Sequence, residues 1–198
     1  QNIQPLYIQK LLTAYQTGKQ PLTVVWDCGN GTSATIVPEL VKFLNGKHIV
    51  LNAAVDGNFP AHAPDASNPA ELTGLKNAVL ENHADLGLAF DGDSDRLGVF
   101  NSRGDFVFMD SLLSVFAEPI LARQKGASIV ADVKCGKTFA SEIKRLGGNP
   151  VITKTGHSFI KEKMIETNAP LGGEKSGHLC FADSYYGYDD ALYAALRL

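Results

Sequence analysis

Three aspartates at alternate positions, Asp91, Asp93 and Asp95, follow an apolar run from Ala84 to Phe90, and Arg96 comes directly after them. Carboxylates this close repel one another unless a cation lies between them, and an irregular loop lets all three point to one place. Oxygen ligands without a nearby His or Cys are typical of a hard ion, Mg²⁺ before Ca²⁺ or Mn²⁺. The stretch is therefore predicted to be a magnesium site.

Two other acidic-loop chemistries fit this stretch less well. An EF-hand needs Gly at loop position six and Glu at position twelve, but counting from Asp91 these positions hold Arg96 and Ser102. A haloacid-dehalogenase-type phosphatase would use an aspartyl nucleophile in a D-x-D-G-[TV] run, where this chain has Ser94 and Asp95. The remaining explanation is an acidic turn that is simply exposed to solvent. Because the aspartates directly follow an apolar strand, a functional site is favoured over such a turn.

A second group of reactive residues lies in the glycine-rich segment LGGEKSGHLCF. Glu174, Ser176 and His178 occupy alternate positions there, so their side chains share one face if the segment is extended. Two titratable groups in such a turn are hard to explain by packing. Polar contacts to a hydroxylated ligand are the use that we predict for them.

Other candidate residues follow predicted strands. Thr155, Gly156 and His157 lie between a strand and a helix, where helix amides can bind an anion. Lys134 follows the strand 129–133, and it is either a functional cation or a solvated one. Gly29 belongs to a G-x-G-x-x-A run that a dinucleotide site could use, but the second strand lacks the acidic residue such a site needs. Tight-turn packing is the preferred explanation for that run.

The elements that position these residues alternate between strands and helices. LTVVWD reads as a buried strand, and its neighbours in chain order complete a βαβ unit with a parallel sheet. Before the acidic loop, the hydrophobic pattern predicts a helix over 4–16, a second helix that ends near 44 and a strand over 48–51. An exposed loop over 56–68 should follow, and then a helix over 68–82 capped by Asn68. After it come a hairpin over 97–109 and a helix opened by Asp110, which Pro119 should kink or split.

The chain then repeats its own pattern. Residues 128–154 have the strand, glycine turn, helix and strand of residues 22–51, with Asp132 in the place of Asp27. The predicted fold class is α/β, with two tandem similar α/β domains, each a mostly parallel mixed sheet with helices on both faces. The two domains are expected to join near residue 105.

Composition narrows the function classes. The 198 residues carry a formal net charge of −3 and show no basic stripe for nucleic acid, and no apolar run has the length of a membrane span. We therefore expect neither a nucleic-acid nor a membrane partner. The three cysteines include no C-x-x-C pair and the start of the chain lacks a signal-peptide pattern, so a cytoplasmic location is expected. The apolar pattern at the end, DDALYAALRL, has no cap or breaker and reads as cut.

Three motifs together resemble those of the α-D-phosphohexomutases, nearest to the bacterial phosphomannomutase/phosphoglucomutase branch. They are DGDSDR at 91–96, KTGHS at 154–158 and GEKSGH at 173–178, and VDGNFP at 55–60 and DVKC at 132–135 support them. The ordered set covers essentially the whole chain and is highly specific.

The resemblance implies an enzyme with four domains around a central cleft. Such enzymes interconvert hexose 1- and 6-phosphates, of glucose or mannose, through a bisphosphorylated sugar. By resemblance Asp91, Asp93 and Asp95 bind Mg²⁺, whose remaining ligand is an active-site phosphoserine. The implied catalytic residues are Arg96, Lys134 and His178, and the implied substrate-binding residues are Lys134, Thr155, Gly156, His157, Glu174, Ser176 and His178.

The chain also departs from the family pattern. The phosphoserine loop, of the type T-A-S-H-N-P, does not occur among these 198 residues, and neither does a C-terminal phosphate-binding domain. Residues 1–104 would be the second domain, and residues 105–198 a C-terminally truncated third domain. We therefore predict that this chain needs domains 1 and 4 of the same enzyme and is inactive alone. A magnesium-dependent sugar-phosphate phosphatase and a non-catalytic sugar-phosphate-binding module remain the alternatives.

Overall fold

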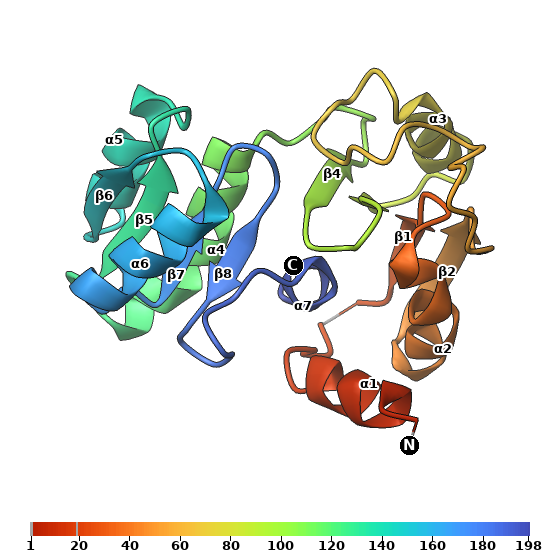
Figure 1. The fold of residues 1–198 in the computed structure, drawn as a ribbon, viewed down its shortest axis with the longest axis horizontal. Helices are drawn as coiled ribbons and strands as arrows, with labels where there is room; N and C mark the ends of the chain where they lie inside the picture. The colour runs from red at the N-terminus through yellow and green to blue at the C-terminus, as the bar shows by residue number, and fades with distance from the viewer. Residues whose placement is uncertain (1, 19) are drawn as a thin grey trace. The chain divides into compact units, whose positions relative to one another are not determined.

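The computed structural model describes residues 2–18 and 20–198, and these divide into two compact units (Figure 1). Unit 1 contains the described residues up to Val107 together with Ala191–Arg197. Unit 2 contains Phe108–Asp190 and Leu198. Unit 1 is thus built from two stretches that are far apart in the sequence.

Unit 1 has a four-stranded sheet in the order β2-β1-β3-β4. Strands β1 (Leu22–Asp27), β2 (Gly46–Leu51) and β3 (Leu86–Phe90) are parallel, and β4 (Leu97–Asn101) pairs antiparallel with β3. The β-branched and apolar residues of β1 and β3 fit this arrangement because both strands lie between two neighbours and are buried. The carboxyl ends of the parallel strands, which carry Asp27 and Asp91, lie at one edge.

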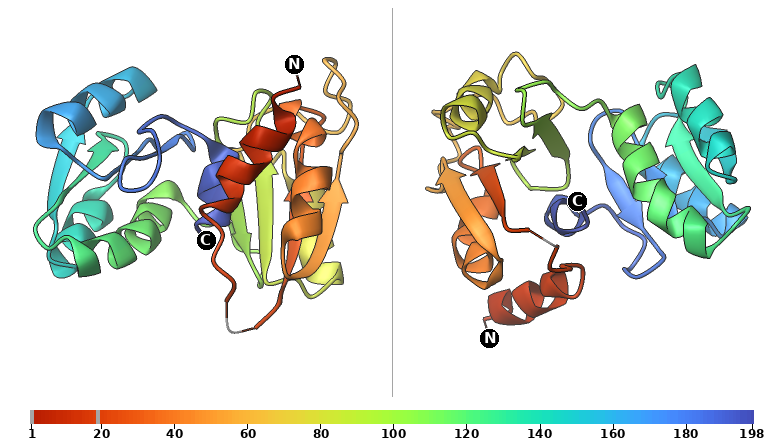
Figure 2. Two further views of the ribbon diagram at one scale, coloured as in Figure 1. Left: turned by 90° about the horizontal axis from the view of Figure 1, so that it is seen from below. Right: turned by 180° about the vertical axis from the view of Figure 1, so that it is seen from behind.

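The core of unit 1 follows the alternation of the strands. Val25 and Ala89 point to the face covered by α3 (Thr73–Glu81), whose Leu75 and Val79 complete this cluster. Trp26 and Phe90 are their neighbours in sequence, and their rings stack with centroids 6.2 Å apart. Helix α7 (Ala191–Leu196) packs against β4 and against α1 (Gln4–Leu12). Figure 2 shows α7 and α1 side by side.

Unit 2 repeats the topology with the strand order β6-β5-β7-β8. Strands β5 (Ser128–Asp132), β6 (Asn149–Thr153) and β7 (Leu171–Gly173) are parallel, and β8 (Leu179–Phe181) is antiparallel to β7. Helices α4 (Met109–Arg123) and α5 (Lys137–Arg145) contact each other, and α6 (His157–Thr167) packs on β5 and β7. The predicted fold class, two tandem α/β domains with mixed sheets, is confirmed.

Several predicted helix boundaries are wrong. The stretch that should form one helix to residue 44 is broken into a 3₁₀ turn at Thr32–Thr35, a short α2 at Val37–Leu40 and a second 3₁₀ turn at Val41–Phe43. Asn68 caps no helix, because its side chain accepts from the amide of Ala70 in a turn and α3 begins later. Helix α1 ends at Leu12, before the predicted residue 16.

The segment after the acidic loop also differs in detail. The predicted hairpin is limited to an antiparallel bridge between Phe100 and Phe106, and the strand that pairs with β4 along its length is β3. Helix α4 begins one residue before Asp110 and runs through Pro119 without interruption. Pro119 lies on the exposed side of α4, where a carbonyl freed from its helix bond can be hydrated.

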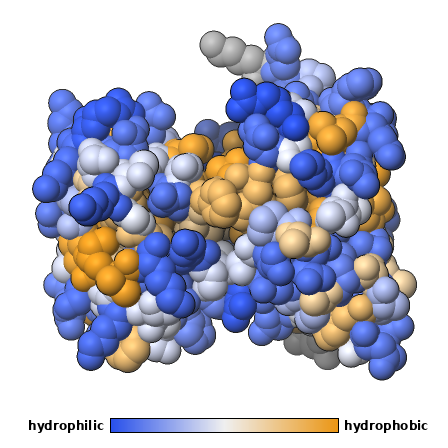
Figure 3. All heavy atoms as spheres, turned by 90° about the horizontal axis from the view of Figure 1, so that it is seen from above, coloured by the Kyte–Doolittle hydropathy of each residue, from blue (hydrophilic) through white to orange (hydrophobic). Residues whose placement is uncertain are grey.

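The surface in Figure 3 is largely hydrophilic, with separate apolar patches. Among residues 2–18 and 20–198, no helix is both long and apolar enough to cross a membrane.

Candidate functional site

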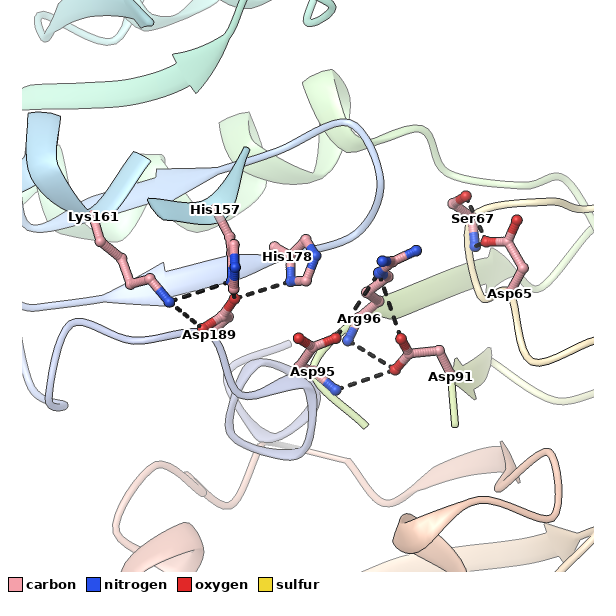
Figure 4. Close-up of polar contacts among 9 residues, drawn as sticks. All are labelled: Asp65, Ser67, Asp91, Asp95, Arg96, His157, Lys161, His178 and Asp189. Carbon is pink, nitrogen blue, oxygen red and sulfur yellow. Dashed lines mark hydrogen bonds and ion pairs between the residues drawn. The ribbon is translucent and has the colours of Figure 1, made fainter. Parts of the chain in front are cut away.

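The three aspartates of the acidic loop come together at the carboxyl end of β3. Asp91, Asp93 and Asp95 each offer a carboxylate oxygen, and these atoms lie within 4.8 Å of one another. Arg96 lies beside them, with its Nε 3.5 Å from Asp91 Oδ2 and 3.9 Å from Asp95 Oδ1 (Figure 4). The predicted cluster therefore forms in unit 1, with one arginine next to it.

Local hydrogen bonds explain why the loop turns its carboxylates inward. Asp91 Oδ1 accepts from the amides of Asp95 and Arg96, both at 3.1 Å, which closes the loop around Asp91. Ser94 has a left-handed backbone with φ 68° and a buried hydroxyl. That hydroxyl lies 2.9 Å from Thr32 Oγ1 and joins the acidic loop to the loop after β1.

The electrostatics of the cluster favour a cation. Burial raises the pKa of Asp91 to about 6, the carboxylates of Asp95 and Asp93 add to this rise, and the amide and guanidinium of Arg96 oppose it. Such a group resists ionisation because its charge is poorly hydrated and repelled by its neighbours. A divalent cation would remove both penalties. The donor set, oxygen only and partly open to solvent, fits Mg²⁺.

The glycines after β1 are explained by packing against the acidic loop. A Cβ on Gly31 would lie 2.7 Å from the carbonyl oxygen of Gly92 and 2.8 Å from that of Asp91. Gly29 has φ 51° and faces the carbonyl of Phe90 and the ring of His62. These close approaches support tight-turn packing as the reason for the G-x-G-x-x-A run.

In unit 2, the predicted glycine-rich turn forms between β7 and β8. The Glu174 amide donates to the carbonyl of His178 at 2.9 Å, and the Gly177 amide donates to the carbonyl of Glu174 at 2.9 Å. Glu174 and His178 are buried. Among the residues that the structure describes, Glu174 Oε2 and Ser176 Oγ are buried and have no hydrogen-bond partner. Such orphaned polar atoms are costly without a ligand.

His157 and His178, predicted from separate motifs, meet on one carboxylate within unit 2. Asp189 Oδ2 lies 2.8 Å from His157 Nδ1 and 3.0 Å from His178 Nδ1, while Lys161 Nζ donates to Asp189 Oδ1 at 3.0 Å (Figure 4). The two imidazole centroids are 5.1 Å apart. Burial alone would raise the pKa of Asp189, but hydrogen bonds from His178, Lys161 and His157 hold it well below its usual range.

Lys134 lies apart from the histidine pair. It lines a pocket of about 290 Å³ in unit 2 together with Asp110, Cys135 and Lys175. Thr155 donates to Asp132, and Gly156 precedes α6 with φ 132°.

Sequence reasoning missed Asp189 and Lys161. Lys161 lies one turn after His157 on α6, so helical spacing offered a signal. Asp189 lies in an irregular segment after Tyr188, where nothing local indicates a partner for His157. Its role depends on a contact across 32 residues of chain.

Fold and site together define a tandem α/β/α protein with a carboxylate cluster at its strand ends. The family described as phosphoglucomutase/phosphomannomutase, alpha/beta/alpha domain II, matches residues 5–104, and domain III of the same family matches residues 109–198. The chain belongs to the phosphoglucomutase/phosphomannomutase family.

Individual relatives agree with this assignment. The phosphomannomutase/phosphoglucomutase of Pseudomonas aeruginosa is 46% identical over 197 residues, which are 100% of this chain and 42% of that protein. A crystal structure of a family protein from Burkholderia thailandensis matches 99% of this chain and 43% of its own, with a TM-score of 0.93 and 40% identity. The chain thus spans less than half the length of these relatives.

A more distant structure shares the fold alone. The N-acetylphosphoglucosamine mutase of Aspergillus fumigatus, in complex with GlcNAc-6P and magnesium, is 16% identical, with a TM-score of 0.70 over 96% of this chain and 49% of its own.

Proposed function

We propose that this chain is the central part of a phosphohexomutase, which interconverts the 1- and 6-phosphates of glucose or mannose through a bisphosphorylated sugar and depends on Mg²⁺. Family membership and the names of the relatives support the reaction class. The observation that carries the proposal is the group of three carboxylates within 4.8 Å at the end of β3. Phosphoryl transfer needs charge neutralisation at the moving oxygens more than covalent help, and such a cluster is suited to supply it.

In this proposal Asp91, Asp93 and Asp95 bind Mg²⁺, which supplies positive charge beside the transferring phosphoryl group when it is bound. Arg96 lies next to two of these carboxylates and adds a fixed positive charge. Its guanidinium can bind a phosphate through two hydrogen bonds. The Aspergillus mutase complex contains magnesium, and we choose the same ion for this chain.

Unit 2 binds the sugar in this proposal. Glu174 Oε2 and Ser176 Oγ are buried and unpaired among the described residues, so hydroxyl groups of a hexose would satisfy both. Each atom can accept from a sugar hydroxyl, and the serine hydroxyl can also donate. The specificity for gluco or manno configuration is left open by these two contacts.

Proton transfer and phosphate binding are assigned to Lys134, His178 and the loop that opens α6. His178 and Lys134 are the candidates for moving the proton of the reacting hydroxyl, and His157, Thr155 and Gly156 bind the substrate beside them. Asp189 Oδ2 lies 2.8 Å from His157 Nδ1 and 3.0 Å from His178 Nδ1, so one carboxylate orients both rings. The opening of α6 at Gly156 adds backbone amides for an anion.

The 198 residues alone are proposed to be inactive, because they contain no phosphoserine loop to deliver the phosphoryl group. A coupled mutase assay with glucose 1-phosphate, Mg²⁺ and glucose 1,6-bisphosphate tests this directly. We expect no turnover above an Asp91→Ala control. Turnover that depends on Asp91 would refute the assignment of this chain as an incomplete enzyme.

Calorimetry with glucose 1-phosphate and Mg²⁺ tests the binding roles. We expect weak binding that Ser176→Ala reduces and that Ser141→Ala, which removes an exposed hydroxyl on α5, leaves unchanged. Tight binding by the isolated chain would favour a sugar-phosphate-binding module instead. Mg²⁺-dependent release of inorganic phosphate would favour a phosphatase.

Metal binding has its own matched controls. Asp93→Ala should abolish the heat of Mg²⁺ binding, while Asp105→Ala, which removes an exposed carboxylate of the same unit, should not. A Mg²⁺ site that survives Asp93→Ala would place the metal elsewhere.

A further inference from the structure

Asp132, the last residue of β5, is completely buried and has no ion-pair partner among residues 2–18 and 20–198. Its charge is met by hydrogen bonds alone. Oδ1 accepts from the amides of Cys135 at 3.2 Å and Lys175 at 3.3 Å, and Oδ2 accepts from Thr155 Oγ1 at 3.1 Å. A buried carboxylate satisfied only by neutral donors holds those donors firmly, because each bond is charge-assisted.

These three donors come from three different loops. Cys135 follows β5, Thr155 follows β6 and Lys175 follows β7, and these strands are neighbours in the sheet. Each loop also carries residues that the proposed function uses, since Cys135 is next to Lys134 and Lys175 lies between Glu174 and Ser176. One carboxylate therefore connects every loop of unit 2 that follows a parallel strand.

The thiol of Cys135 adds to this arrangement. Burial and the nearby carboxylate of Asp132 raise the pKa of Cys135 far above its usual value, so the thiol stays protonated. It serves as a weak donor beside Asp132 and does not compete as a second anion.

Unit 1 has a carboxylate at the equivalent position, with different partners. Asp27 ends β1 and accepts from the Gly29 amide at 3.0 Å, from Asn52 Nδ2 at 2.7 Å and from His62 Nε2 at 3.2 Å. A histidine cation thus meets part of its charge. In unit 2 no cation takes that place, and the donors are the substrate loops themselves.

We propose that Asp132 is a positioning residue that sets the three substrate loops of unit 2 relative to one another. It acts through the amides of Cys135 and Lys175 and the hydroxyl of Thr155, without touching the sugar. The coupling between loops stands on the contacts alone, and only its consequence for sugar phosphate rests on the proposed function.

The first test is residue-specific NMR of the whole chain. In Asp132→Asn, amide resonances over 134–136, 155–156 and 174–178 should shift and their hydrogen exchange should rise at least tenfold, while amides of α4 and α6 keep their exchange rates. The matched control is Asp183→Asn, which alters another buried carboxylate of unit 2, one that pairs with Arg123. Loops that stay unchanged in Asp132→Asn, or that respond equally to both variants, would overturn the proposal.

A gentler pair of variants covers the case in which Asp132→Asn fails to fold. Thr155→Val removes one donor and should shift the amides of Cys135 and Lys175, which belong to other loops. Thr155→Ser keeps a hydroxyl and should restore them. Changes confined to the loop of Thr155, or a valine variant that the serine variant does not rescue, would refute the coupling.

A titration with glucose 1-phosphate and Mg²⁺ separates the two ideas. If the wild-type chain binds the sugar phosphate and Asp132→Asn binds it at least tenfold more weakly, the proposed function and the positioning role of Asp132 are both supported. If the wild-type chain and the variant bind it equally well, the positioning role is wrong. If the wild-type chain does not bind it, the sugar-phosphate function is wrong, and the exchange data still decide whether Asp132 couples the loops.

Discussion

The ion pair between Asp27 and His62 yields a prediction that does not depend on any ligand. Asp27 is 1% exposed, and His62 Nε2 lies 3.2 Å from its Oδ2 while His62 Nδ1 lies 2.8 Å from the carbonyl of Ala63. Both of these partners can only accept, so both ring nitrogens donate and the imidazole is charged. The hydrogen bond to Asp27 raises the pKa of His62, and this bond, with those from Asn52 and Gly29, lowers the pKa of Asp27 against the effect of burial.

Breaking this pair should destabilise unit 1. Removing one member of a buried ion pair costs ~3–5 kcal/mol because the other charge stays buried. Asp27 keeps its bonds from Gly29 and Asn52, so we expect His62→Ala to lose about 3 kcal/mol. With a urea dependence of ~1–3 kcal/mol per molar, the unfolding midpoint should fall by about 1–3 M.

The loss should depend on pH in a defined direction. The raised pKa of His62 means that its contribution is complete below ~6.5 and disappears as pH rises through the folded-state pKa. The lowered pKa of Asp27 means that its contribution is present above ~3.9 and disappears as pH falls through its own folded-state pKa. The difference between wild type and His62→Ala should therefore be largest between about pH 4 and 6.5.

The single tryptophan provides the assay. Trp26 lies in β1 next to Asp27, so its fluorescence reports unfolding of unit 1. Urea titrations at pH 6 and pH 9 should show the larger difference at pH 6. His83→Asn is the control, because His83 is exposed and its φ of 49° suits asparagine. If the difference in unfolding midpoint between wild type and His62→Ala is constant with pH, or greater at pH 9, the charged pair is refuted.

Three further substitutions test the packing and charge of the two units. Gly31→Ala places a Cβ against the carbonyls of Gly92 and Asp91 and should cost ~1–3 kcal/mol by urea titration, whereas Gly57→Ala meets no atom within 4 Å and should be nearly neutral. Asp93→Asn removes one of three repelling carboxylates, so without metal the urea midpoint of unfolding should rise slightly. Added Mg²⁺ should no longer raise this midpoint, and a continued rise with Mg²⁺ would contradict the metal site. Pro119→Ala restores an amide to α4 and should stabilise unit 2 by about 1–3 kcal/mol in thermal circular dichroism, and a loss of stability would show that the proline is required.

The sheets and the acidic loop were predictable because their signals are local. A buried β-branched run such as LTVVWD and an aspartate loop directly after an apolar strand are both readable within about ten residues. The internal repeat was readable as well, and the two sheets share one strand order. The equivalence of Asp27 and Asp132 follows from that repeat.

The remaining features depend on contacts between distant segments. Asp189 is recognisable only once the chain brings it to His157, and the carboxylate of Asp132 is significant only once Thr155 and Lys175 reach it. The division of the predicted helix into two 3₁₀ turns and the short α2 had no clear local signal in the sequence.

Helix α7 has a consequence for the order in which the chain folds during synthesis. Its residues Ala191–Leu196 are buried in unit 1, against α1 and β4, although all of unit 2 precedes them in the sequence. A ribosome therefore releases unit 2 in full before unit 1 can close. The apolar residues Ile8 and Leu11 of α1 are made before unit 2, and their helix must wait for a partner that emerges about 180 residues later. Unit 2, made without interruption, is free to fold first.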